Sequence, residues 1–262
     1  MASSLLYPGE PIYHDGTPIH TIKDYGFGRG LDLSQRGEDG YAGVAEPFPS
    51  SLMIPRSEWQ ARIAEREEQK AILSGLCTQA GLKSKNQQQT NFCWANAPTY
   101  GLEVIRVVQN QTPVVFSPAS VACPINGFRN EGGWGKQALE QIAKAGAVPA
   151  DIWPANAIDQ RYYTADAKAQ ALKYRFSEWW ELEPGNIDQL VSTLLRGVPV
   201  AVGLGWWGHE VTFVDPLWLD GAIAIRFRNS WGDGYGSNGY GTLQGQKMSP
   251  DDAVAPRLAT AA

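Results

Sequence analysis

The sequence predicts an α+β protein built as two lobes, and three observations support this prediction. Helical patterns gather in the first half of the chain, whereas short β-branched or alternating runs follow residue 197. The 262 residues are 43% hydrophobic, which is enough to bury a sizeable core. Ten Trp, ten Tyr and eight Phe exclude a disordered chain, because a chain with few aromatic residues is the kind that fails to collapse.

Residues 1–51 are expected to form an extended, loop-rich arm outside the main domain. Six glycines lie between Tyr25 and Ala45, and Pro47 and Pro49 follow, so neither helical nor strand periodicity survives. The run GFGRG is predicted to be a plain loop and not a phosphate-binding loop, because it lacks a preceding strand and a following helix. The main domain is expected over residues 52–248, and 249–262 should form an irregular tail.

Four segments carry helical signals, and three carry strand signals. Helices are predicted over 57–74, 93–109, 135–145 and 187–196. Strands are predicted over 198–204, 210–214 and 222–228, where β-branched runs are bounded by Gly, Pro and Asp.

Composition excludes several classes of function. A net charge of −5 gives no electrostatic support for a nucleic-acid partner, and no stretch is apolar enough for a membrane span. The amino terminus lacks the basic start of a secretory signal, so a cytoplasmic or virion-associated location is expected. The three cysteines are an odd number at no repeating spacing, so no disulfide framework is expected. No metal and no cofactor is expected.

Cys93 is the first candidate for chemistry. A lone cysteine is usually a small buried hydrophobe, but this one would open a buried helix, where the helix dipole lowers a thiol's pKa. Gln87 stands six residues earlier and Trp94 follows directly. Of three histidines, only His209 lies outside the arm, and twenty residues after it the run NSWGDGYGSNGY begins at Asn229.

These residues, in this order and with the pair Gly132 and Gly133 between Cys93 and His209, resemble the papain-type cysteine peptidases. The resemblance covers about residues 52–245, because Pro55 to Trp59 is similar to the opening of the family's mature domain. It implies a papain-like fold of two lobes and hydrolysis of peptide bonds in a peptide or protein substrate.

The resemblance also implies a role for each residue. Cys93 would be the nucleophile, His209 would take and return the proton, and Asn229 would fix the imidazole ring. Trp231 would shield that ring contact from water and lie in the substrate region. Gln87 would donate to the oxyanion together with the backbone N–H of Cys93.

Gly132 and Gly133 would let a substrate backbone approach the cleft wall, although a simple turn is an alternative. The chain departs from the family at Thr90 and Asn130, which replace a disulfide pair, and at Asn91, which replaces a glycine. The family's long helical propeptide is replaced by the glycine-rich arm, so zymogen control by that route is not expected.

Two other functions stay open. The chain could be a structural or interaction protein that uses this scaffold within a larger assembly, such as a viral or phage particle, with residues 1–51 as the attachment arm. A thiol hydrolase of cell-wall peptides would share the cysteine and histidine, but it has no reason to keep NSWGDGYG.

Overall fold

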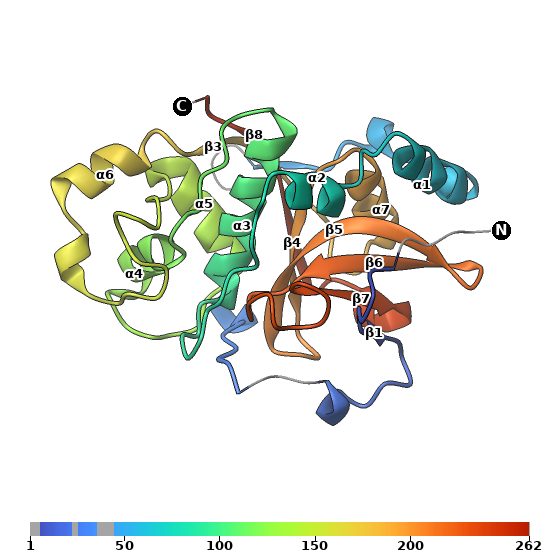
Figure 1. Cartoon of the computed structure of the whole chain (residues 1–262), viewed down its shortest axis with the longest axis horizontal. Helices are drawn as coiled ribbons and strands as arrows, with labels where there is room; N and C mark the ends of the chain where they lie inside the picture. Colours follow the sequence, from blue (N-terminus) through green and yellow to red (C-terminus); the bar gives the residue numbers. More distant parts are fainter. Residues whose placement is uncertain (1–5, 23–25, 36–44, 262) are drawn as a thin grey trace.

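Helix α3 (Cys93–Val108) separates a helical lobe from a strand-rich lobe in the computed structural model (Figure 1). The structure describes residues 6–22, 26–35 and 45–261. The helix is apolar on nearly all sides, and its residues from Cys93 to Arg106 are all buried, as expected for a helix packed between two layers. Near its amino end α3 meets the sheet, where the hydroxyl of Thr212 donates to the carbonyl of Ala97 at 3.0 Å.

One sheet of eight strands runs through the strand-rich lobe in the order β1-β7-β6-β5-β4-β8-β3-β2. Its strands are β1 (Ile12–Tyr13), β2 (Ala45–Pro47), β3 (Phe176–Glu181), β4 (Val200–Leu204), β5 (His209–Leu219), β6 (Ala222–Arg228), β7 (Tyr240–Gln244) and β8 (Asp252–Ala259). The predicted strands over 198–204, 210–214 and 222–228 correspond to β4, β5 and β6, and the bounds of β6 agree.

Seven α-helices surround or separate the two lobes within the described residues. Besides α3 they are α1 (Trp59–Glu68), α2 (Leu73–Gln79), α4 (Ala119–Asn126), α5 (Gly135–Ala145), α6 (Ala165–Ala171) and α7 (Ile187–Leu195). The prediction of one helix over 57–74 is wrong, because Lys70 adopts a φ of 55° and ends α1 before α2 begins. The predictions for α3, α5 and α7 agree with the structure.

The prediction of an irregular tail over 249–262 is wrong. Residues 252–259 form β8, which pairs antiparallel with β4 on one side and β3 on the other. Its first five residues are buried, so the segment belongs to the centre of the sheet.

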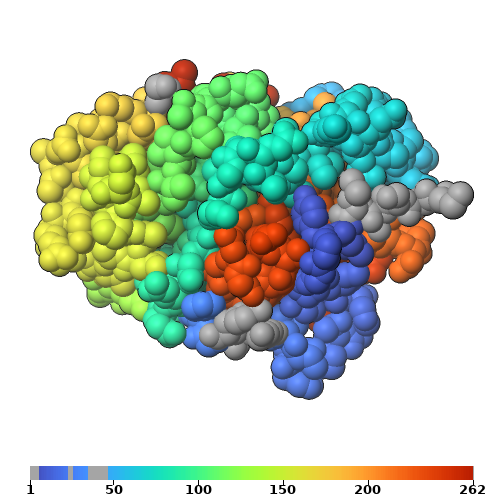
Figure 2. Space-filling view, in the orientation of Figure 1, coloured from blue at the N-terminus to red at the C-terminus, as the bar shows by residue number. Residues whose placement is uncertain are grey.

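The expectation that residues 1–51 lie outside the main domain is also wrong for the part that the structure describes. Tyr13, Ile22 and Phe48 are buried in the same core as the sheet, and β1 and β2 pair with β7 and β3. Residues 1–5, 23–25 and 36–44 of the predicted arm lie outside the described residues. Figure 2 shows the dark-blue part of the arm lying on the strand-rich lobe.

A buried ionic network fastens the start of the arm to the sheet. The Arg226 guanidinium contacts Glu10 at 3.0 Å and Asp215 at 3.4 Å. Asp215 also accepts the backbone N–H of Leu73 at 2.7 Å, at the start of α2. Because these charges are almost completely buried, removing one leaves another without its partner.

Within the described ranges, no helix is long and apolar enough to cross a membrane, and no group of three or more His, Cys, Asp or Glu is arranged to hold a metal ion. Cys77, Cys93 and Cys123 are all buried and free.

Candidate active site

Cys93 is the first residue of α3, as predicted, but its thiol is closed off from solvent. Its exposed fraction is 0%, and the backbone N–H of Gly30 donates to Sγ at 3.2 Å. The pKa of Cys93 is raised to about 12, chiefly by burial and then by Glu210, while backbone hydrogen bonds from Gly30, Glu210 and Trp94 act in the opposite direction. The acidic thiol expected from the helix position is therefore absent from this closed arrangement.

His209 opens β5 and contacts Asn229, as the sequence predicts. The distance from His209 Nε2 to Asn229 Oδ1 is 2.8 Å. The indole of Trp231 stacks on the imidazole with ring centroids 4.8 Å apart, so it covers this contact. Burial lowers the pKa of His209 to about 4, and Arg29 lowers it further, whereas the bond to Asn229 raises it. The imidazole is therefore neutral at pH 7.

The bond to Asn229 also defines which imidazole nitrogen is basic. Asn229 Oδ1 accepts the backbone N–H of Ser230 at 2.8 Å, so this end of the amide is an acceptor. Nε2 of neutral His209 must then carry the hydrogen, and Nδ1 keeps its lone pair. Nδ1 has no hydrogen-bond partner among the described residues. The Cys93 thiol is therefore not hydrogen-bonded to this nitrogen, although the backbone of Glu210, the next residue after His209, hydrogen-bonds the sulfur of Cys93.

Gln87 binds two peptide carbonyls, one from the arm and one from its own loop. Its Nε2 donates to the carbonyl oxygen of Gly28 at 2.7 Å and to that of Thr90 at 2.8 Å. Its Oε1 accepts from the Ser230 hydroxyl, which fixes the orientation of the amide. The donor predicted to serve an oxyanion is therefore already placed against a backbone carbonyl.

Gly133 pairs with the arm through its backbone. The N–H of Gly133 donates to the carbonyl of Gly30 at 2.9 Å, and the N–H of Asp32 donates to the carbonyl of Gly133 at 2.8 Å. A Cβ on Gly133 would lie 2.5 Å from the Trp94 ring, and one on Gly132 would lie 2.7 Å from the carbonyl oxygen of Gly30. Gly132 therefore permits a close approach of the arm backbone, whereas the missing side chain at Gly133 leaves room for the Trp94 ring.

Residues 27–32 thus cross the site as an internal ligand, which the sequence analysis missed. Phe27 lies 6.3 Å from Trp231 by ring centroids, and the N–H of Gly28 donates to the carbonyl of Gln88 at 3.0 Å. Cβ atoms on Gly28 and Gly30 would overlap the carbonyl oxygens of Thr90 and Asn91. The alternating glycines of GFGRG were the signal in the sequence for this contact, because they let the arm backbone lie directly against the backbone of Thr90 and Asn91.

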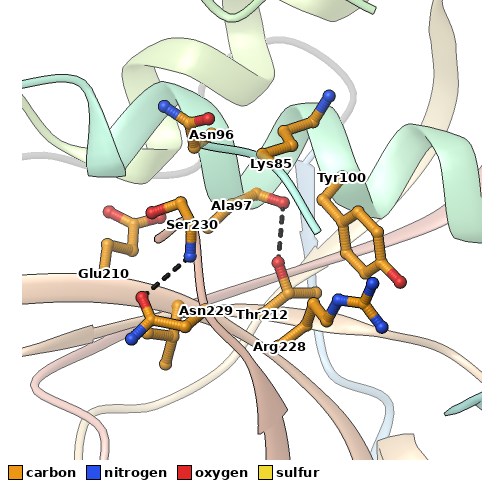
Figure 3. A pocket seen from close by; sticks show the side chains of 10 residues that line it. Lys85, Asn96, Ala97, Tyr100, Glu210, Thr212, Arg228, Asn229 and Ser230 are labelled. Atoms are coloured by element: carbon orange, nitrogen blue, oxygen red, sulfur yellow. Dashed lines mark hydrogen bonds between the residues drawn. The ribbon is translucent and has the colours of Figure 1, made fainter. Parts of the chain in front are cut away.

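A buried carboxylate, also missed, lies next to this site. Glu210 has an exposed fraction of 0%, and its carboxylate receives a hydrogen bond from the backbone of Gly135. Figure 3 shows its side chain beneath α3, in a pocket shared with Asn229 and Ser230. Burial raises the pKa of Glu210, and Asp252 raises it further, whereas the backbone of Gly135 lowers it.

A buried ion pair supports the loop that carries Gln87. Lys85 Nζ donates to Glu103 on α3 at 2.6 Å and to the carbonyl of Phe116 at 2.9 Å. Both side chains of the pair are almost completely buried. The loop between Lys85 and Cys93 is therefore fixed to the same helix that presents the thiol.

Comparison with known proteins finds similarity to cysteine proteases. No family model matches the chain. A senescence-specific cysteine protease of Arabidopsis thaliana is 26% identical over 183 residues, which are 61% of this chain and 52% of that protein. The chain therefore spans about half the length of this curated relative.

Solved structures with the same fold include two cysteine proteases. Digestive procathepsin L 3 of Tenebrio molitor larval midgut has a TM-score of 0.63 at 19% identity, over 86% of this chain and 78% of that one. Xylellain, a cysteine protease from Xylella fastidiosa, has a TM-score of 0.60 at 18% identity, over 89% and 96%. The chain has the fold of the papain-like cysteine proteases and resembles that family in sequence.

Proposed function

We propose that the chain is a thiol peptidase that hydrolyses peptide bonds through Cys93, His209 and Asn229, with Gln87 as an oxyanion donor. The observation that carries this proposal is the 2.7 Å bond from Gln87 Nε2 to the carbonyl oxygen of Gly28, in the same arm segment whose Gly30 N–H contacts the sulfur of Cys93. Acyl transfer requires a donor that binds a peptide carbonyl and a thiol that reaches the same peptide segment.

In the first step, the Cys93 thiol gives its proton to Nδ1 of His209, and the thiolate attacks the substrate carbonyl carbon. The S–C bond forms as the carbonyl π electrons move to oxygen, which receives hydrogen bonds from Gln87 and the Cys93 backbone. When the C–N bond breaks, the amine leaves with the proton from His209. Water then hydrolyses the thioester and restores the thiol.

In the described arrangement the arm would hold the peptidase latent. The atom of the arm that contacts Cys93 Sγ is the amide nitrogen of Gly30, a donor and not an electrophile. The carbonyl of Gly30 also accepts the backbone N–H of Gly133, and a substrate backbone would need this same donor. Catalysis therefore requires that residues 27–32 leave the cleft, after which the thiol regains water and its pKa falls.

The test compares two quantities: the alkylation rate of Cys93, which reports how loosely the arm is held, and kcat on a peptide, which reports catalysis. Gln87→Ala removes a bond to Gly28, so Cys93 should react faster with iodoacetamide, whereas kcat on a fluorogenic peptide should fall about a hundredfold. Gln89→Ala is the matched control, because its side-chain amide donates to Gly26 at 3.1 Å and also contacts the arm. It should loosen the arm without lowering kcat.

Cys93→Ser should abolish cleavage. Peptide hydrolysis that survives Cys93→Ser, or equal losses of kcat in the Gln87 and Gln89 variants, would contradict the proposed roles.

A further inference from the structure

A cavity of about 240 Å³ opens into the helical lobe, and none of the residues that line it belongs to the site around Cys93. Its wall is built from α4, the end of α5 and α6, all of which lie in the helical lobe (Figure 1). An apolar cavity of roughly 150 Å³ is large enough to bind benzene, so this space suits a single aromatic ring with a short chain.

Small residues keep this space open. Ala145 ends α5, and Ala167 and Ala171 lie one turn apart on α6. All three line the cavity, where longer side chains would fill it. Gly146 adopts a φ of 82° directly after α5, and a Cβ there would lie 1.8 Å from the carbonyl oxygen of Ala171. The end of α5 therefore lies directly against the end of α6, and the alanines leave room beside that contact.

The interior of the cavity offers a ligand mainly apolar surface. Trp153 is completely buried, and its indole N–H already donates to the carbonyl of Ala157 at 2.8 Å. The hydroxyl of Ser120 donates to a backbone carbonyl at 2.7 Å. Tyr163 and Leu172 also line the cavity but are 38% and 50% exposed, so they form its mouth. An aromatic ring in the cavity would remove this apolar surface from water, which favours binding.

Two positive charges lie at the same opening. Lys144, in the last turn of α5, and Lys168, on α6, both line the cavity and are exposed. The ammonium group of Lys168 lies 3.8 Å from the centroid of the Tyr163 ring, which holds it at the mouth. Within the described ranges neither lysine has an ion-pair partner. A small anion therefore meets two uncompensated cations beside an apolar cavity.

We infer that this cavity binds a small aromatic carboxylate, with the ring between α4, α5 and α6 and the carboxylate at Lys144 and Lys168. The ring would be buried against Trp153 and the alanines, and the two ammonium groups would donate to the carboxylate oxygens. The net charge of the chain is −5, which repels anions, so affinity for a carboxylate would depend on these two lysines. Binding at this cavity does not require the peptidase function, because it involves none of the residues around Cys93.

Calorimetric titration of the full chain with three probes of similar shape tests the preference for negative charge. The anion is 3-phenylpropionate, its neutral counterpart is 3-phenylpropionamide, and the cation is 3-phenylpropylamine. The anion should bind with a Kd of about 1 mM or tighter, and at least about fivefold more tightly than the amide, because exposed ion pairs each contribute modestly. The amine should bind more weakly than the amide.

Variants with matched controls locate the binding. The double variant Lys144→Gln and Lys168→Gln should remove the preference for the anion over the amide. Lys173→Gln is its control, because Lys173 is also exposed and close to α6 in sequence but does not line the cavity. Ala167→Leu should fill the cavity and weaken binding of both probes at least about tenfold, whereas Ala165→Leu, at an exposed position of the same helix, should leave both unchanged.

Equal Kd values for the anion and the amide, or a preference that survives the double lysine variant, would overturn the inference. It would also be overturned if Ala167→Leu left binding unchanged or if no probe bound the wild-type chain. Both lysines are exposed, so their double variant decides the outcome even where Ala167→Leu fails to fold.

Discussion

Replacing Gly30 with alanine should open the site, because this glycine lies against the cleft backbone. Its φ is not left-handed, so alanine causes no backbone strain there, but its Cβ would overlap the carbonyl of Asn91. The carbonyl belongs to rigid backbone next to α3, so the arm must move instead. Gly30→Ala therefore acts on the position of the arm and not on the catalytic residues.

The size of the effect follows from the bonds that Gly30 places. Moving it breaks the bond from its N–H to Cys93 Sγ and the bond from Gly133 to its carbonyl, and it disturbs the bond from the Asp32 N–H to Gly133. At about 1 kcal/mol each, these bonds sum to about 3 kcal/mol. If the thiol reacts only from the open arrangement, its alkylation should accelerate about a hundredfold.

The assay is the rate of iodoacetamide modification of each cysteine, read by peptide mass spectrometry at pH 8. Cys77 is completely buried in a cluster that includes no residue of the segment 27–32, and it serves as the internal reference for global unfolding. Gly234→Ala is the matched variant, because a Cβ there would meet no atom within 4 Å. If Gly30→Ala changes the Cys93 rate by less than about threefold, or accelerates Cys77 equally, the arm does not control access to the thiol.

Three further measurements test the network, the arm and the buried acid. Glu10→Ala should cost about 3–5 kcal/mol in urea unfolding, because it leaves Arg226 buried with one partner fewer; a loss below 1 kcal/mol would contradict this. A chain that starts at Ser51 should melt far below the full chain, since Tyr13 and other core residues are lost; an unchanged Tm would be inconsistent with a buried arm. Burial raises the pKa of Glu210 above 4.5, so the folded chain keeps a proton that the unfolded chain releases, and stability falls as pH rises. The free energy of unfolding of Glu210→Gln relative to wild type should therefore increase by up to about 1.4 kcal/mol per pH unit from pH 5 to 7, whereas a constant difference would refute the raised pKa.

The sequence predicted those helices and strands whose ends are marked by residues within the segment itself. The start of α3 at Cys93 and the bounds of β6 follow from apolar periodicity and from the glycines and aspartates that flank them. Both of these signals lie within the segment that they describe. The pairing of His209 with Asn229 was instead implied by the resemblance of the motif order to a known family.

The rest depended on contacts between distant segments. Pro256 argues against a central strand, because proline donates no ladder hydrogen bond. It is tolerated in β8 since the pairing with β4 covers only residues 252–254, so Pro256 lies beyond it. The function of Gly30 depends on Asn91, which is distant in the sequence, and the high pKa of Cys93 depends on the arm that covers it. No pattern within either segment reports its partner.

The central place of β8 also has a consequence for how the molecule is made. This strand follows every other described helix and strand in chain order, yet it is the one that joins β4 to β3. While the ribosome still holds it, both neighbours present unsatisfied edges, which are templates for pairing with other chains. The nascent protein must therefore keep two halves of a sheet apart until their shared middle strand emerges, which makes translation the interval of greatest aggregation risk.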